Sequence, residues 1–317
     1  MSKSTKTSKK RGRPKKNADL DFANLSLSVN VNQKNEYPPN NIILSKMATQ
    51  LKDKDYEMIL RYDKAKVFET LLKGYKSKQK NINIIFTSSG MIFNHNMDDK
   101  DQVRFECKIF PDNLLEYGLK DLKKEIIIKV EIDTLHKILK SVPKNHEFSF
   151  EMYDGKKDRT FRVVTKDPIR NKYDDKQITI SPITHYNIIT FKDDKLYDTI
   201  IMFEAEEFNK ICKNIKLFST TFTINVYKNN LRVVFEYNKD KTLTCYSVLY
   251  PSKKCIFIQK PNTDIKNKYN LTSFIKYTES YKCSNVVKLY VSLDKPLIIE
   301  YPVEPGLGVF QIFVQSQ

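Results

Sequence analysis

A helix followed by a β-hairpin recurs four times along this 317-residue chain, and this repeat limits the possible folds more than any other feature. Apolar residues at helical spacing predict the helices, with anchors at Phe68, Leu135, Phe208 and Phe274. The first two anchors lie 67 residues apart and the last two 66, and the two pairs are offset by 140 and 139 residues. Such regular spacing predicts a duplicated α+β domain.

The predicted hairpins carry turn residues where their strands reverse. These turns stand between runs of alternating apolar and polar side chains, at Ser88-Ser89-Gly90, Asp154-Gly155 and Asn229-Asn230. Two similar domains built of antiparallel sheets are therefore expected, at 54–181 and 197–317, with a connector at 182–196. Residues 1–53 lack sustained periodicity and are predicted to form a mobile basic tail.

The charge of the chain favours a polyanionic partner. The formal net charge is +17, and residues 1–16 contribute +8 of it, because they hold six lysines, two arginines and no acid. The remaining residues carry +9, so both parts are basic. Nucleic acid is the usual partner of such a surface, although charge alone does not separate DNA from RNA or a membrane.

Several classes of protein are disfavoured by what the sequence lacks. The five cysteines are odd in number and form no CxxC pair, which argues against a disulfide framework or a zinc module and favours a reducing intracellular compartment. No apolar run approaches 18 residues, so no membrane span or membrane partner is expected. The seven glycines form no nucleotide-binding loop, and no hydrolase motif occurs. We therefore expect no enzyme, no cofactor and no metal site.

Lysines recur on the polar faces of the predicted helices. At 100° per residue, Lys210 and Lys213 point away from the apolar face of their helix, and Lys137 and Lys140 occupy the matching positions of another. Lys66 and Lys73 lie seven residues apart on a third. Any surface helix exposes some lysine, so one helix alone would mean little. Three such helices in a repeated domain indicate a surface that contacts phosphate groups.

A short basic segment in the tail resembles an AT-hook, a motif whose arginines enter the narrow minor groove of A·T-rich DNA. Its residues are Lys10 followed by Arg11, Gly12, Arg13, Pro14, Lys15 and Lys16. A nuclear-import signal or an unspecific electrostatic arm would have the same composition, and one segment can serve both purposes. The tail is thus a second candidate for contact with DNA.

The body of the chain resembles the DNA sliding clamp family of the proliferating cell nuclear antigen type over nearly all of residues 56–317. The segment "SLDKPLIIEYPVEPGLGVFQIFV" is similar to the family's C-terminal hairpin and final strand, and "EAEEFNKICKNIK" to the first helix of its second domain. The segments "TSSGMIFNHNMD" and "HKILKSV" are similar to its first hairpin and second helix. These patterns of seven to some twenty residues stand in the family's order.

The resemblance implies a homotrimeric ring of duplicated clamp domains, with sheets outside and helices lining a central hole. Positions that face DNA in the family match Lys66, Lys137, Lys140, Lys210 and Lys213, and Lys73 lies on the same face by the helical count. The fourth helix departs from the family, because Thr272 and Glu279 stand where basic residues are common. Lys276 is then the residue of the fourth helix that is expected to contact DNA.

The resemblance also implies two contact surfaces for proteins. A groove for partner peptides would involve the 97–103 loop, the connector and the C-terminal hairpin, with Met97, Val103, Ile188, Ile189, Phe191, Pro296, Phe310, Gln311, Ile312 and Phe313. Subunits would join through two strand edges, formed by Gln177, Ile178, Thr179, Ile180 and Ser181 and by Leu243, Thr244, Cys245, Tyr246, Ser247 and Val248. Both edges alternate apolar and polar residues, as a pairing strand requires.

The function that these features predict is a DNA polymerase processivity factor, which encircles double-stranded DNA and tethers replication and repair proteins without doing chemistry. Its expected partners are DNA polymerase, other clamp-binding peptides and a clamp loader. The composition and the tail are typical of a large DNA virus, which places the protein in the host nucleus or a viral replication factory. The alternatives are a clamp-fold viral transcription factor and a monomeric AT-hook DNA-binding protein.

Overall fold

A computed structural model describes residues 48–51, 56–76, 80–94, 103–153, 160–180, 197–239, 242–275, 278 and 282–317. All of these residues lie within one compact unit, Asn40–Gln317. We call residues 48–180 the first half and residues 197–317 the second half. The AT-hook-like segment and most of the connector lie outside the described residues.

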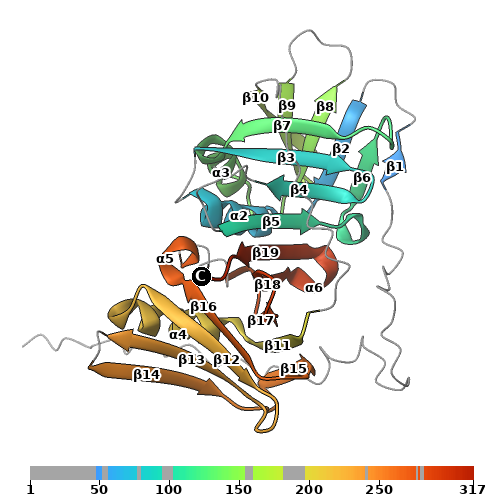
Figure 1. Ribbon diagram of the computed structural model, residues 1–317. Coiled ribbons are helices and arrows are strands. Elements are labelled where there is room, and N and C mark those ends of the chain that lie inside the picture. The colour runs from blue at the N-terminus through green and yellow to red at the C-terminus, as the bar shows by residue number, and fades with distance from the viewer. Residues whose placement is uncertain are drawn as a thin grey trace, which may run out of the picture. The chain divides into compact units, whose positions relative to one another are not determined.

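Among its described residues, the first half contains ten strands, two α-helices and one 3-10 helix, and most of them are labelled in Figure 1. In chain order they are β1 (Thr49–Gln50), β2 (Tyr56–Tyr62), α2 (Ala65–Lys76), β3 (Asn81–Thr87), β4 (Gly90–Asn94), β5 (Val103–Ile109), η1 (Pro111–Asn113), β6 (Glu116–Leu119), β7 (Ile126–Glu131), α3 (Ile132–Lys140), β8 (Glu147–Tyr153), β9 (Thr160–Asp167) and β10 (Lys172–Thr179).

The second half repeats this order. Its elements are β11 (Thr199–Glu204), α4 (Ala205–Phe218), β12 (Thr221–Tyr227), β13 (Arg232–Lys239), β14 (Leu243–Leu249), β15 (Cys255–Gln259), β16 (Ile265–Asn270), α5 (Leu271–Phe274), β17 (Val286–Val291), β18 (Leu297–Val303), α6 (Glu304–Leu307) and β19 (Gly308–Val314). One strand, one helix and three strands thus recur four times, beginning at β2, β7, β11 and β16. The predicted α+β repeat is confirmed.

The strands form three sheets. Two of these sheets lie within one half each, and the remaining one runs through both halves. The first sheet has the order β1-β6-β2-β8-β9-β10, and the third has the order β14-β13-β12-β16. The second is a nine-stranded sheet, β15-β11-β17-β18-β19-β5-β4-β3-β7, that runs through both halves. Its two parts join where β5 pairs antiparallel with β19, with Cys107 opposite Phe310. This seam makes the halves one continuous structure.

The helices fill the space between the sheets with large apolar side chains. Phe68 of α2 is fully buried and meets Phe93, Phe148 and Phe150 edge-on, at ring-centroid distances of 5.3–6.1 Å. Phe208 plays the same part in α4, against Phe203. Burying a phenylalanine contributes roughly 1.5–3 kcal/mol, so these anchors fix the helices and hence the direction of their polar faces.

Residues 48–51 correct the predicted start of the folded body. They were assigned to the mobile tail, but β1 pairs in parallel with β6, with Thr49 opposite Gly118. Ala48 is only 4% exposed and joins the hydrophobic core. The sequence did not reveal this strand because two exposed residues cannot show a period. The earlier tail residues lie outside the part of the chain that the structure describes.

Candidate nucleic-acid interface

The lysines predicted to contact DNA are exposed on three helices. Lys66 and Lys73 lie on α2, Lys137 and Lys140 on α3, and Lys210 and Lys213 on α4, and all six are exposed. The opposite faces are buried, because each helix has its apolar residues at intervals of three and four. The core therefore holds the lysine faces toward solvent. Lys276, the seventh predicted residue, lies outside the described residues.

Ion pairs divide these lysines into two groups. Lys66 pairs with the buried carboxylate of Glu69, one turn along the same helix. Lys210 Nζ lies 3.4 Å from Glu206 Oε1, also one turn away. Within the described ranges, no acidic side chain pairs with Lys73, Lys137, Lys140 or Lys213, so these four lysines carry charge that an incoming phosphate group can neutralise. The Lys210–Glu206 pair is exposed on both sides, and a pair of this kind contributes roughly 0–1 kcal/mol, so Lys210 is weakly held.

A neutral histidine lies beneath the lysines of α2 and α3. His136 is 9% exposed, and its Nε2 lies 3.7 Å from Glu69 Oε1. Burial, followed by the charge of Lys76, lowers the pKa of His136 below its ordinary value, although the nearby Glu69 opposes this shift. The imidazole therefore adds no positive charge to the helix faces at neutral pH.

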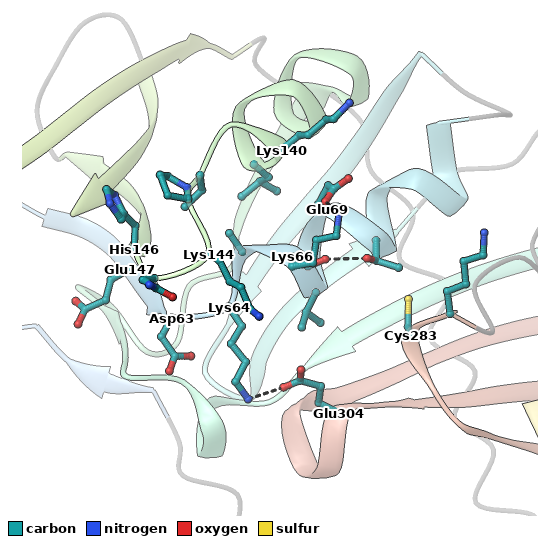
Figure 2. A pocket seen from close by; sticks show the side chains of 18 of the residues that line it. Asp63, Lys64, Lys66, Glu69, Lys140, Lys144, His146, Glu147, Cys283 and Glu304 are labelled. Atoms are coloured by element: carbon teal, nitrogen blue, oxygen red, sulfur yellow. Dashed lines mark hydrogen bonds and ion pairs between the residues drawn. The ribbon is translucent and has the colours of Figure 1, made fainter. Parts of the chain in front are cut away.

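A crevice of about 1070 Å³ opens beside the lysine faces, where the start of α2 and the end of α3 approach residues of the second half (Figure 2). Lys66 and Lys140 line it together with three lysines that the sequence analysis missed, Lys64, Lys144 and Lys282. Lys64 and Lys144 stand outside the helices and strands and Lys282 stands in a short 3-10 segment, so no helical spacing marks them. Lys64 Nζ lies 3.0 Å from Glu304 Oε2, which ties the first half to the second across the crevice.

The fourth predicted helix is described only in part. Within the described residues its α-helical part is α5, Leu271–Phe274, and Asn270 caps the start by accepting a hydrogen bond from the Thr272 N–H at 3.0 Å. The predicted departure from the family at Thr272 is thus an exposed position beside a cap. Glu279 lies outside the described residues. The exposed lysine faces that the structure describes come from α2, α3 and α4.

The groove predicted for partner peptides is divided between the two faces of the nine-stranded sheet. Gln311 and Phe313 lie on the face turned away from the main core, where Phe313 packs with Tyr197 and Ile298, and Pro296 stands just before β18 in contact with Tyr197. Val103, Phe310 and Ile312 belong to the main core instead, so their side chains point away from the face that carries Phe313. Side chains alternate between faces along a strand, and 310 and 312 point opposite to 311 and 313. The remaining predicted groove residues, Met97, Ile188, Ile189 and Phe191, lie outside the described residues.

The apolar residues that surround Phe313 were not predicted from the sequence. Tyr197, Ile200, Tyr290 and Ile298 come from three strands and the segment before β11, so only the sheet register brings them together. Tyr197 donates a hydrogen bond from its hydroxyl to the Pro296 carbonyl at 3.0 Å. We call this group, with Phe313 and Pro296, the apolar cluster.

A buried carboxylate borders the apolar cluster. Glu300 is 5% exposed and accepts hydrogen bonds from Gln311 Nε2 at 2.8 Å, Lys288 Nζ at 3.1 Å and the Tyr290 hydroxyl at 3.2 Å. Three donors offset the cost of burying this charge. The negative charge of Glu300 contributes to raising the pKa of Tyr290, after burial. Gln311 is therefore held in place by Glu300.

The two strands predicted to join subunits both lie at sheet edges. β10 is the last strand of the first sheet and pairs with β9, and β14 is the last strand of the third sheet and pairs with β13. β14 exposes three large apolar side chains, those of Leu243, Tyr246 and Val248. Gln177, Ile178 and Thr179 lie in β10 and Ile180 follows it, whereas Ser181 lies outside the described residues.

The described residues show no arrangement typical of a metal centre or a membrane span. No group of three or more potential metal ligands occurs among them, and none of their helices is long and apolar enough to cross a membrane. The five cysteines are free, and three of them are buried. Burial raises the pKa of the Cys283 thiol to about 12, so this thiol stays protonated at neutral pH.

Comparisons with known proteins agree on one family. Residues 192–316 match the family described as proliferating cell nuclear antigen, C-terminal domain. "Proliferating cell nuclear antigen 2" of Drosophila melanogaster is 28% identical over 110 residues, which are 35% of this chain and 42% of that protein. "Proliferating cell nuclear antigen" of Caenorhabditis elegans is 26% identical over 200 residues, which are 60% of this chain and 73% of that protein. The chain thus spans less than half of the first relative.

A solved structure shares the fold. The crystal structure of proliferating cellular nuclear antigen from Entamoeba histolytica matches with a TM-score of 0.68 and 19% sequence identity. The match covers 83% of this chain and 99% of the Entamoeba chain. The fold class is therefore that of a duplicated clamp domain, with antiparallel sheets and packed helices.

Proposed function

We propose that this chain is a sliding clamp of the proliferating cell nuclear antigen type, a processivity factor that encircles duplex DNA and tethers DNA polymerase to it. One observation carries the proposal: three helices of a clamp fold turn exposed lysines away from the core, and four of these lysines have no acidic partner among the described residues. The family match of residues 192–316 supports it.

The lysine faces suit contact with the phosphate backbone. Lysine is a point charge on a flexible stem, and phosphate contacts carry no sequence information. Such contacts are also weakened by salt, because each releases condensed counterions. A protein held by these contacts alone would dissociate readily. In our proposal a closed ring prevents this loss, while the lysines of α2, α3 and α4 let the protein slide.

The ring would be a homotrimer joined through β10 of one subunit and β14 of the next. Both are edge strands, so each has backbone groups that a further strand can pair with. The apolar side chains exposed on β14 would be covered by this contact. The apolar cluster beside Glu300 is the proposed docking site for polymerase and other clamp-binding peptides, including those of repair proteins.

The proposed roles of the N-terminal segment and of a clamp loader, and the proposed location in the cell, rest on the amino-acid sequence. The segment Arg11–Lys16 would add a contact with A·T-rich DNA or act as an import signal. A clamp loader would open the ring. The basic tail and the lysine-rich composition favour the host nucleus or a viral replication factory as the site of action. No step of this function requires a catalytic residue or a cofactor.

Mass photometry of the purified full chain tests the assembly on which the proposal depends. Three chains of 37.3 kDa give about 112 kDa, and we expect this species to dominate at sub-micromolar concentration. A species of 37.3 kDa alone, under conditions in which the chain is folded by circular dichroism, would contradict the proposed ring. It would favour the monomeric DNA-binding alternative.

A further inference from the structure

The lysine face of α4 contains an exposed apolar side chain, that of Leu217. At about 100° per residue, Leu217 lies within about 20° of Lys210 and about 40° of Lys213 around the helix axis. It is 74% exposed, more than any other leucine of the described residues. Ile211 and Ile215 are buried on the opposite side of the helix. Leu217 therefore points to solvent from the face that is proposed to contact DNA.

The end of α4 is fixed to the body of the protein. Phe218, the last residue of the helix, stacks on Tyr237 of β13, with ring centroids 6.3 Å apart and an interplanar angle of 26°. Tyr237 belongs to the main core. The Ser219 N–H donates to the Ile215 carbonyl at 2.8 Å and closes the last turn. These contacts hold the helix end in place, so the exposed position of Leu217 does not result from fraying.

The matching position of α2 holds a lysine. Lys66 and Lys73 are seven residues apart on α2, and Lys210 and Leu217 are seven residues apart on α4. Lys73 is exposed, as Leu217 is. Single exposed apolar side chains are common on proteins, so exposure by itself indicates no partner. The position of Leu217 does indicate one, because the same place on a lysine face is charged in one repeat and apolar in the other.

The residues around Leu217 are basic, so a partner that covers it must suit a leucine and lysines together. Lys213 precedes Leu217 by about 6 Å along the helix axis and has no acidic partner in the part of the chain that the structure describes. Lys216, next to Leu217, is exposed as well. An apolar protein surface would bury these ammonium groups without partners, which is costly. A DNA strand offers phosphate groups to the lysines and, between successive phosphates, a deoxyribose whose carbon atoms suit a leucine.

We propose that Leu217 contacts the deoxyribose of duplex DNA, between phosphate groups that Lys210 and Lys213 bind. This inference rests on the proposed role of the helix faces in binding DNA. A phosphate contact releases condensed counterions and weakens as salt rises, whereas covering an apolar side chain releases none. Leu217 thus adds a small part of the affinity for DNA that does not depend on salt, and it distinguishes α4 from α2.

The salt dependence of DNA binding separates this contact from those of the lysines. The affinity of the full chain for linear duplex DNA would be measured by fluorescence anisotropy between about 50 and 200 mM salt. We expect Leu217→Gln to lower the affinity about threefold to tenfold at every salt concentration, because part of the burial of a leucine is lost. The slope of log affinity against log salt should stay unchanged. Lys213→Gln, in contrast, should reduce this slope by about 1.

Two further variants serve as controls. Leu115 is an exposed leucine that belongs to no helix or strand, so Leu115→Gln should bind DNA as the wild type does. Leu217→Lys gives α4 the pattern of α2, and we expect it to raise the slope by about 1, since the new charge would stand beside phosphate groups. Glutamine and lysine have helix propensities close to that of leucine, so α4 should be kept, which circular dichroism checks.

The possible outcomes distinguish this contact from the proposed function. Wild-type affinity of Leu217→Gln, together with a reduced slope for Lys213→Gln, would overturn the leucine contact and leave the lysine contacts standing. A loss of affinity in Leu217→Gln with a smaller slope would also overturn it, because the lost contact would then be one with phosphate. An unchanged slope for Lys213→Gln would remove α4 from the DNA contact altogether, and the failure would then lie in the proposed function.

Discussion

The helix faces and the sheet edges of this protein have opposite surface chemistry. The faces of α2, α3 and α4 present lysines above a buried apolar side, whereas β14 contains no charged residue and exposes Leu243, Tyr246 and Val248. Charge on a surface favours contacts that form and break quickly and weaken with salt. Exposed apolar strands favour contacts that persist. One region suits a sliding partner and the other a fixed one.

The two edges also differ from each other. β10 carries Lys172, Asp174, Asp175 and Lys176, and Asp175 is engaged by Arg162 of the neighbouring strand at 2.5 Å. β14 contains no charged residue that could pair with these side chains. Contact between β10 of one copy and β14 of the next would be a head-to-tail arrangement, which can close into a ring.

The largest expected effect comes from breaking an edge. Tyr246→Pro removes a backbone donor in the middle of β14, and we expect folded monomers in size-exclusion chromatography, with the circular dichroism spectrum retained and polymerase stimulation lost. A lost ladder bond and an unsatisfied partner cost about 1–3 kcal/mol at each contact. Tyr246→Thr, which keeps the strand backbone, is the control and should assemble more fully. Trimers formed by Tyr246→Pro would show that β14 is not the subunit contact.

The same test at the other edge is Ile180→Pro, which we also expect to yield monomers. Ile180 follows β10 and its side chain belongs to the main core. This variant therefore loses core packing as well, and its melting temperature must be measured before the loss of assembly is interpreted. If the folded variant still ran as a trimer, β10 would be excluded as the partner of β14.

Reversing charge on the helix faces should affect DNA and leave assembly intact. We expect the quadruple change of Lys137, Lys140, Lys210 and Lys213 to Glu to abolish polymerase stimulation, because all four side chains are exposed on helices and none of them belongs to β10 or β14. Mass photometry should still give the trimer. Normal stimulation by a trimeric quadruple variant would remove the helix faces from the DNA contact.

The ion pairs on the helix faces predict a smaller difference. Lys137 and Lys213 have no acidic partner among the described residues, whereas Lys66 and Lys210 each pair with a glutamate. Neutralising the first two lysines should therefore weaken DNA binding more than neutralising the second two. We expect the slope of log affinity against log salt to fall by about 2 for the first pair and by less for the second. Equal slopes for both double variants to Gln would show that the carboxylates release their lysines to DNA.

Deleting residues 1–40 should have the smallest effect on the body. The deletion removes the +8 charge of residues 1–16 and keeps residues 48–51. We expect weaker binding to linear A·T-rich duplex, with a melting temperature within about 2 °C of the full chain, because a mobile tail, as the sequence predicts, buries little surface. Fluorescence anisotropy and calorimetry measure the two quantities. A large fall in melting temperature would mean that the segment supports the fold.

The sequence predicts local elements of this fold better than the contacts between them. Phe68, Leu135 and Phe208 mark three helices because one face of a helix repeats every three to four residues. Nothing in the alternation of β5 or β19 specifies that these strands, about 200 residues apart, pair with each other. The apolar cluster was missed for the same reason, since Tyr197, Tyr290 and Phe313 meet only through the register of the nine-stranded sheet.

Part of the candidate site could have been predicted more accurately from the residues alone. The period of two along β19 places Phe310 and Ile312 opposite to Gln311 and Phe313, so both pairs cannot contact the same partner. The lysines of the crevice are different, because Lys64 and Lys144 stand outside the helices and strands, where side chains follow no period. Their approach to Glu304 and Lys282 depends on the packing of two halves that are distant in sequence.

Retention on end-capped DNA tests the central claim, that a closed ring rather than affinity holds the protein on DNA. The full chain would be threaded onto linear duplex through free ends, which are then blocked with streptavidin, and washed at about 0.5 M salt, where phosphate contacts are largely lost. We predict that capped DNA retains the protein and that a restriction cut between the caps releases it. Equal loss from capped and open DNA would contradict the ring.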